Sequence, residues 1–240
     1  MSTTELPLML GRQPAMRPAA LSDLAVYATE KLPPPPAKSA VPNTPYPIDG
    51  NDKYGDCTMA GVAHLIAAWN VDFDQRQAVP DEDEVVKEYF TLTDKKDTGL
   101  VEANVLKRWH TDGLFGEKIA GYAPVNAKDT LEIHQAIAFY GGCYLGIECP
   151  RSAQEQFREN KPWTYVEGSP VEGGHCIVAL GYDEHGVECA TWGGVALVTY
   201  PFLAHYLDEA WVILSQQLVD EKQDKLGISL ATLQADLKKV

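Results

Sequence analysis

The 240-residue sequence lacks any apolar run of the length, about 18 residues, that a helix needs to cross a membrane. Its first residues, MSTTELPLMLGRQP, also lack the basic start and apolar run of a signal peptide. We therefore expect no membrane partner. We expect a cytoplasmic protein, or one that is incorporated into a virion or another assembly.

Basic residues are scarce as well. The 20 Lys and Arg residues are outnumbered by 34 Asp and Glu residues, which gives a net charge of −14. This charge disfavours binding to nucleic acid or to an anionic membrane. The acids are spread along the chain, as on a solvated surface. With 45% hydrophobic and 22% charged residues, the composition is that of a globular protein with a sizeable core.

The five cysteines form no CxxC pair, and no His, Cys or carboxylate set has metal-ligand spacing. We therefore expect no metal and no cofactor. An odd number of cysteines without a signal peptide indicates reduced thiols rather than a disulfide framework. The cysteines are Cys57, Cys143, Cys149, Cys176 and Cys189.

Proline divides the chain into regions. Residues 1–45 hold many of the prolines, including the run at 33–36, and we expect an extended arm with one short helix over 19–32. We expect this arm to pack on the protein's own body or on a partner, rather than in an active-site cleft. Residues 46–215 then form one domain, and residues 216–240 form a helical tail.

Hydrophobic periodicity predicts helices first and strands later. Helices are expected over residues 56–72, 80–90, 101–112, 127–140 and 151–159. Strands are expected over residues 119–125, 143–149, 175–183, 187–193, 196–200 and 209–215. This order predicts an α+β fold in which a helical lobe, about 46–142, meets a β-rich lobe, about 143–215, in a cleft.

Residues 51–70, NDKYGDCTMAGVAHLIAAWN, begin as a polar turn and become an apolar helix. Asp56 is a good N-cap residue, so Cys57 falls in the first helical turn. There the helix dipole favours a thiolate, although the neighbouring carboxylate opposes it. Gly55 lets the backbone approach a substrate. The stretch suits a nucleophile with a cationic partner; the alternative is an inert buried thiol.

His175 follows two glycines and begins the apolar run HCIVALGYD. An imidazole at such a strand end can pair with a thiolate and carry its proton. The alternative is a structural histidine at a strand edge. Of the other histidines, His64 lies about 10 Å along the helix from Cys57, too far for a hydrogen bond. His205 is the remaining competitor.

Three short motifs occur together: Asn51 with Gly55-Asp56-Cys57 at a helix start, Gly174-His175 entering HCIVALGY with Gly181-Tyr182 at its end, and Thr191-Trp192-Gly193. In these motifs, across residues 45–215, the sequence resembles the papain-like cysteine peptidases, in particular the small members encoded by bacteria and their phages. The resemblance implies a helical lobe that carries the cysteine and a β-rich lobe that carries the histidine.

The resemblance also implies roles for these residues. Cys57 would attack an amide of a peptide or protein substrate, and His175 would serve as base and then acid. The side-chain amide of Asn51, six residues before the cysteine, would help to hold the oxyanion. Gly55, Gly174 and Trp192 would line the substrate cleft.

One departure affects the expected activity. The family usually orients its histidine with an Asn, and that position is Ala190 here. The hydroxyl of Thr191 is the candidate replacement. Two functions therefore stay open: a cysteine hydrolase, or a catalytically weak papain-like scaffold that binds an assembly partner through its arm. The arm itself differs from the long helical inhibitory segments of many family members.

Overall fold

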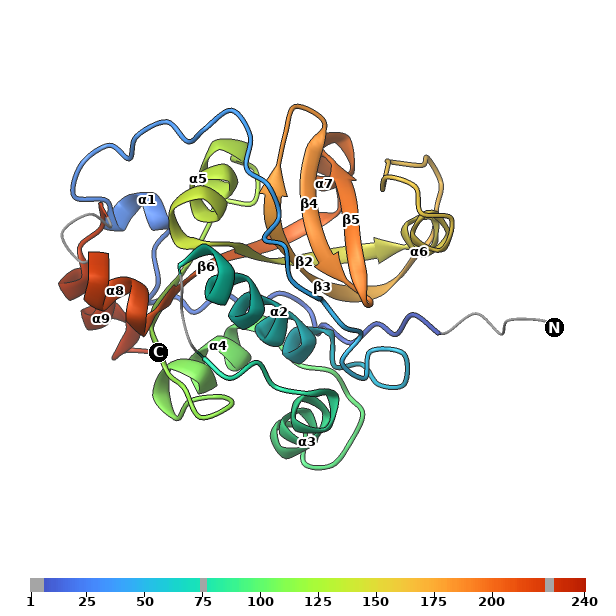
Figure 1. Cartoon of the computed structure of the whole chain (residues 1–240), viewed down its shortest axis with the longest axis horizontal. Coiled ribbons are helices and arrows are strands. Elements are labelled where there is room, and N and C mark those ends of the chain that lie inside the picture. Colours follow the sequence, from blue (N-terminus) through green and yellow to red (C-terminus); the bar gives the residue numbers. More distant parts are fainter. Residues whose placement is uncertain (1–6, 74–76, 223–226) are drawn as a thin grey trace.

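The computed structural model describes residues 7–73, 77–222 and 227–240. In this part of the chain, one six-stranded sheet has the order β1-β6-β2-β3-β4-β5, with every neighbouring pair antiparallel (Figure 1). The strands are β1 Ile119–Pro124, β2 Cys143–Pro150, β3 Val171–Tyr182, β4 Gly186–Thr191, β5 Gly194–Thr199 and β6 Leu207–Ser215. Each expected strand is present, which confirms a mixed fold of helices and sheet.

Helices surround this sheet. They are α1 Leu24–Tyr27, α2 Cys57–Asp72, α3 Glu82–Leu92, α4 Glu102–Thr111, α5 Thr130–Tyr140, α6 Arg151–Arg158, α7 Tyr200–Tyr206, α8 Gln216–Lys222 and α9 Leu230–Leu237. Helix α7 is not among the helices predicted from the sequence. It has seven residues and a proline in its first turn, where proline is favoured. Among the described residues, no helix is both long and apolar enough to cross a membrane.

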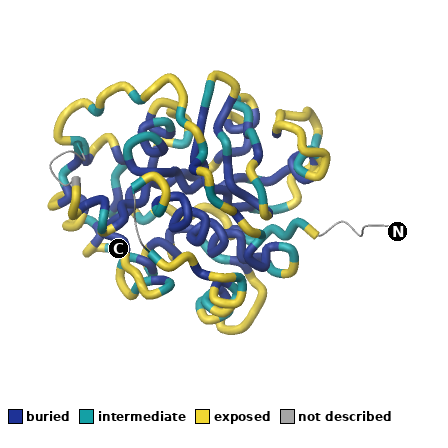
Figure 2. The backbone as a smooth tube through the Cα atoms, viewed as in Figure 1, coloured by how far each residue is buried: buried dark blue, intermediate teal, exposed yellow. Residues whose placement is uncertain are grey.

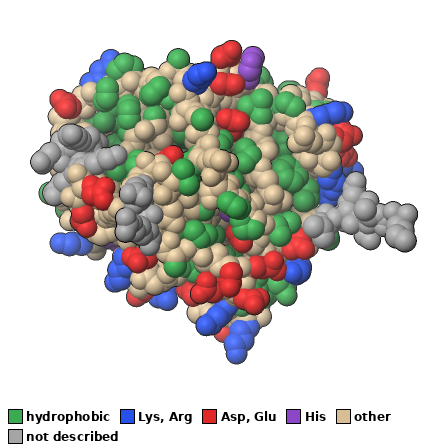
Figure 3. Space-filling view, in the orientation of Figure 1, with side chains coloured by type: hydrophobic (Ala, Val, Ile, Leu, Met, Phe, Trp, Pro, Cys, Tyr) green, Lys and Arg blue, Asp and Glu red, His purple; other side chains and the backbone are tan. Residues whose placement is uncertain are grey.

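The ends of α3 and α5 follow from local side-chain chemistry. Asp81 accepts from the Glu84 N–H and Glu84 accepts from the Asp81 N–H, which forms a capping box at the start of α3. Gly141 ends α5 in the left-handed region, with φ of 79°, where glycine carries no steric penalty. In Figure 3, acidic side chains gather over the region of α3.

The helix expected over residues 19–32 is wrong in extent, because only Leu24–Tyr27 is helical. The backbone after α1 pairs with the C-terminal part of the chain instead. Thr29 N–H donates to Gly227 O, and Ser229 N–H donates to Tyr27 O. The sequence also favours a break in the helical tail at Leu226-Gly227. Leu226 lies outside the described residues, and α8 and α9 stand on either side.

Helix α2 lies at the centre of the molecule and is buried along most of its length (Figure 2). It packs against β3 and β4, and this contact brings its first residue, Cys57, to the middle of the sheet. The approach is close because Gly61 has no side chain. A Cβ at this position would lie 2.8 Å from the Tyr144 ring on β2 and 3.3 Å from the Cys176 sulfur on β3.

Replacing Gly61 with valine should therefore push α2 off the sheet. We expect Gly61→Val to lower the free energy of unfolding by about 1–3 kcal/mol, because an overpacked core must strain to admit the added atoms. Urea unfolding followed by circular dichroism measures the change. Lys87→Val, on an exposed helical position of α3, is the control and should cost about 0.5 kcal/mol. An equal effect of both variants would contradict the close contact.

Candidate active site

Cys57 is the first residue of α2 and is only 2% exposed. Its sulfur accepts a hydrogen bond from the backbone N–H of Cys176 on β3, at 3.4 Å. The Gly11 backbone N–H also interacts with this thiol. The thiol therefore lies where a helix start, a central strand and the N-terminal arm meet.

The environment of this thiol keeps it protonated. Burial raises the pKa of Cys57 to about 12, and the neighbouring Asp56 adds to the increase, while the N–H of Cys176 opposes it. Asp56 is itself fully buried, and burial raises the pKa of its carboxyl to about 8. At neutral pH both groups are mainly uncharged.

His175 lies on β3 and is fully buried. Its Nε2 atom is 2.7 Å from the Thr191 hydroxyl oxygen at the end of β4. The imidazole stacks on the Trp192 indole, with ring centroids 4.2 Å apart and planes inclined by 17°. Burial, and then the positive charge of Arg12, lower the pKa of His175 to about 3. The ring is therefore held rigidly and is neutral.

Cys57 and His175 line one small cavity of about 10 Å³, close to the smallest volume that holds a water molecule. His175 Nδ1 is buried without a hydrogen-bond partner among the described residues. Since Nε2 is used by Thr191, Nδ1 is the nitrogen left free for proton transfer. The cavity is also lined by Asn51, Ala60, Gly61, His64, Cys176, Ala190, Thr191 and Trp192.

Asn51 lines the same cavity, but its amide is already engaged. Nδ2 donates to Tyr54 O at 3.0 Å, and the amide also interacts with the Asp56 carboxyl. The amide must turn from at least one of these groups before it can donate to an oxyanion. Its expected role stays a prediction.

The other histidines differ in position. His64 Nε2 lies 2.8 Å from Pro47 O, and burial lowers the pKa of His64 to about 4. His205 is exposed on α7 and packs against the Tyr165 ring, with centroids 4.3 Å apart. His175 alone of these three contacts Thr191 and Trp192.

The expectation that the N-terminal arm stays out of the cleft is wrong. Residues 9–13, the cleft segment, run past Cys57 in an extended conformation. Gly11 N–H and Arg12 N–H both donate to Gly174 O, at 3.2 and 3.0 Å, and Leu100 N–H donates to Gly11 O at 3.0 Å. Beside them, Trp192 Nε1 donates to Met9 O at 3.0 Å.

Glycines make room for this backbone-to-backbone contact. A Cβ on Gly11 would overlap the Gly55 carbonyl oxygen, and one on Gly174 would overlap the Arg12 carbonyl oxygen. Gly55 and Gly174, which the sequence places in the substrate cleft, thus both contact the cleft segment. Gly11 and Arg12 are not among the site residues predicted from the sequence; the signal that points to them is a glycine in a proline-flanked extended stretch.

The fold built around this site is that of the papain-like cysteine proteases. Xylellain, a cysteine protease from Xylella fastidiosa, superposes with a TM-score of 0.67 at 15% identity, over 90% of this chain and 99% of that chain. The Carica candamarcensis cysteine protease CMS1MS2 superposes with a TM-score of 0.56 at 14% identity, over 75% of this chain and 99% of that chain. The cysteine protease and lectin-like domains of Clostridium difficile Cwp84 superpose with a TM-score of 0.57 at 10% identity, over 80% of this chain and 53% of that chain.

Neither the family models nor the curated proteins compared with the sequence match it. At identities of 10–15%, the likeness to solved structures establishes the fold, and function has to be argued from the site.

Asp56 provides a pH test of this buried site. Its carboxyl ionises above about pH 4 in the unfolded chain but keeps its proton to about pH 8 in the folded one, so its contribution to stability is lost as pH rises through this window. The stability of Asp56→Asn relative to the unmodified protein should therefore rise by about 3–4 kcal/mol between pH 5 and pH 8. Urea unfolding at both pH values measures it.

Asp83→Asn, on the exposed side of α3, is the matched control and should show no such growth. A constant difference for Asp56→Asn at the two pH values would mean that this carboxyl is ionised in the folded protein.

Proposed function

We propose that this protein is a cysteine peptidase that cleaves amide bonds of peptides or proteins with Cys57 and His175. The observation that carries the proposal is the shared cavity. A helix-start thiol, an imidazole bonded to Thr191 and a covering Trp192 line it together, within a papain-like fold. These are the groups that thiol-dependent acyl transfer requires.

The chemistry follows from the positions of the protons. His175 Nδ1 accepts the Cys57 proton as the sulfur attacks the substrate carbonyl carbon. The imidazolium then returns this proton to the departing amine, which leaves a thioester. Water, deprotonated by the same imidazole, hydrolyses the thioester and restores the thiol. The Asn51 amide, once released from Tyr54 O, would donate to the oxyanion in both halves of the reaction.

Thr191 orients the His175 ring. Its hydroxyl lies 2.7 Å from His175 Nε2 and can accept the N–H of that nitrogen, which fixes the tautomer with a free Nδ1. A hydroxyl does this without a charge, so it stabilises an imidazolium less than a carboxylate would. Trp192 holds the ring plane by stacking.

The cleft segment controls this chemistry. While residues 9–13 are in place, burial keeps the thiol protonated, and burial together with Arg12 keeps the imidazole neutral. When they leave, water reaches Cys57 and the Arg12 charge moves away. Both changes bring the pKa values of the two groups closer together and favour the thiolate–imidazolium pair. Activity therefore requires displacement of the cleft segment.

A second candidate function is a binding or structural protein on the same scaffold, with the arm engaging an assembly partner. The neutral, buried state of Cys57 and the filled cleft favour it. The two candidates differ in one respect: only the peptidase hydrolyses peptides when the cleft is opened.

Replacing Gly11 with valine opens the cleft without shortening the chain, because any side chain there overlaps Gly55 O. We expect Gly11→Val to speed labelling of Cys57 by a thiol-directed epoxide at pH 7 by at least about tenfold, and to reveal peptide hydrolysis. Mass spectrometry locates the adduct.

Met16→Val, at an exposed position of the arm, is the control and should label like the unmodified protein. Cys57 in an opened cleft should also outpace the four strand cysteines. Rapid labelling of Cys57 without any hydrolysis of peptides would favour the scaffold function.

Thr191→Val, made in the Gly11→Val chain, removes the hydroxyl and keeps the side-chain volume. We expect kcat to fall about 10- to 100-fold with KM nearly unchanged, because His175 loses its orienting partner but the cleft keeps its shape. Thr111→Val, on the exposed surface of α4, is the control. An unchanged kcat would show that Thr191 does not orient His175, and Ala190→Asn would then be expected to raise kcat.

A further inference from the structure

The side chain of Arg12 is fully buried in a pocket formed by β2 and β6, although it belongs to the N-terminal arm. Nη1 donates to Glu209 Oε1 at 2.8 Å, and Nη2 donates to Glu148 Oε1 at 3.0 Å and to Asp208 Oδ2 at 2.9 Å. Nη2 also donates to Ile147 O at 3.2 Å. We call this set, Ile147, Glu148, Asp208 and Glu209, the acidic recess.

The acidic recess needs a cation. Glu209 is largely buried, and Glu102 on α4 is fully buried close enough to act on both Arg12 and Glu209 electrostatically. Although burial opposes its charge, these acids raise the pKa of Arg12 above its usual value. Without Arg12 the buried Glu209 would have no cationic partner in the recess, which is strongly unfavourable.

The recess is also shaped for a long side chain. Gly146 on β2 forms part of its wall. A Cβ at this position would lie 2.5 Å from Glu209 Cγ and 2.8 Å from Arg12 Cδ. The aliphatic stem of Arg12 therefore fits in the recess because residue 146 has no side chain.

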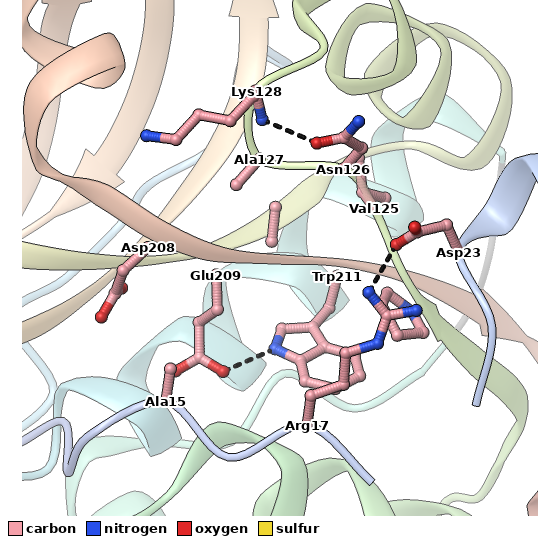
Figure 4. A pocket seen from close by; sticks show the side chains of 12 residues that line it. Ala15, Arg17, Asp23, Val125, Asn126, Ala127, Lys128, Asp208, Glu209 and Trp211 are labelled. Carbon is pink, nitrogen blue, oxygen red and sulfur yellow. Dashed lines mark hydrogen bonds and ion pairs between the residues drawn. The ribbon is translucent and has the colours of Figure 1, made fainter. Parts of the chain in front are cut away.

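Asp208 and Glu209 also line an open cavity of about 400 Å³, which Figure 4 shows. Glu209 Oε2 accepts from the Trp211 indole N–H at 3.1 Å, so its carboxylate is fixed even without Arg12. Asp208 is 31% exposed. Glu209 is thus held in place at the buried end of the recess, while Asp208 and Glu148, which is 46% exposed, border on solvent.

The recess lies next to the candidate catalytic thiol. Gly11 passes the Cys57 sulfur, and Arg12 is the next residue along the cleft segment. The contacts of residues 11 and 12 with Gly174 and Leu100 use backbone atoms, so peptides of other sequences can make them. The ion pairs of Arg12 depend on the side chain and distinguish one peptide from another.

We propose that the acidic recess is a binding site for an arginine side chain of an extended peptide that replaces the cleft segment. The enzyme then selects peptides with an arginine one residue away from the residue at Cys57. Cleavage of such peptides rests on the proposed peptidase function, whereas their binding rests on the Arg12 contacts alone.

Arginine fits this recess better than lysine. The guanidinium places its two terminal nitrogens on different acceptors, with Glu209 on one side and Glu148 with Asp208 on the other. A planar fork satisfies these directions together, whereas an ammonium group is a single compact charge.

Peptide binding tests the recess without any turnover. The full-length chain carries Cys57→Ala to prevent reaction, with Gly11→Val and Arg12→Ala to vacate the cleft. Fluorescent peptides with the sequence of residues 7–14 carry arginine, lysine or citrulline at the position of Arg12, and anisotropy gives the Kd. We expect arginine to bind at least about tenfold tighter than citrulline, its neutral isostere, and also tighter than lysine. Equal Kd values for arginine and citrulline would overturn the proposal.

Recess variants identify the groups responsible. Asp208→Asn and Glu209→Gln should each reduce the arginine-to-citrulline ratio, whereas Glu159→Gln, an exposed acid paired with Lys161, should leave it unchanged. If the triple variant does not fold by circular dichroism, Arg12→Ala with Cys57→Ala replaces it. A ratio insensitive to both recess variants would place the selectivity elsewhere and contradict the proposal.

Hydrolysis by the Gly11→Val/Arg12→Ala chain, with Cys57 intact, separates the two proposals. Arginine-selective binding without hydrolysis would leave the recess standing and count against the peptidase. Hydrolysis with no preference for arginine would support the peptidase and overturn the recess.

Discussion

The site depends on the close contact between the start of α2 and strand β3. Gly61 allows the helix to lie against the sheet, and the Cys57 sulfur then meets the backbone N–H of Cys176. Since Cys176 follows His175 on the same strand, this single contact sets both candidate groups around one cavity. The same contact buries both groups, and burial is the largest cause of their neutral state.

Arg12 connects the arm to this site in two ways. Its guanidinium compensates the acids of β2 and β6, and its charge also lowers the pKa of His175. Occupation of the recess and suppression of the imidazolium are therefore linked, because one side chain does both. Any peptide that places an arginine in the recess brings a similar charge near His175, so strong binding there opposes protonation of the histidine while the arginine remains bound.

Much of the fold could be predicted from the sequence, because strand and helix patterns are local. The helix that starts at Cys57 and the capping box at Asp81 follow from residues a few positions apart. The contact between His175 and Thr191 could also be predicted, since both residues lie in recognisable motifs. The path of the arm could not be predicted. Its position depends on partners far along the chain, such as Gly174 and Glu209, and proline content only indicates that it is extended.

The cleft segment is part of the chain that it covers, so its binding is intramolecular. Its local concentration at the cleft is set by the length of chain that links it to the docked part of the arm. For short flexible links this concentration is of millimolar order, and it does not fall on dilution. A peptide arriving from solution competes against this fixed local concentration of the cleft segment. Its apparent affinity is therefore weaker than its intrinsic affinity, because it can bind only the fraction of molecules whose cleft is open. A cut in the chain between Gln13 and the docked residues that begin at Leu21, just before α1, would turn the segment into a diffusible ligand. At micromolar protein concentration, the equilibrium would then move towards the open cleft.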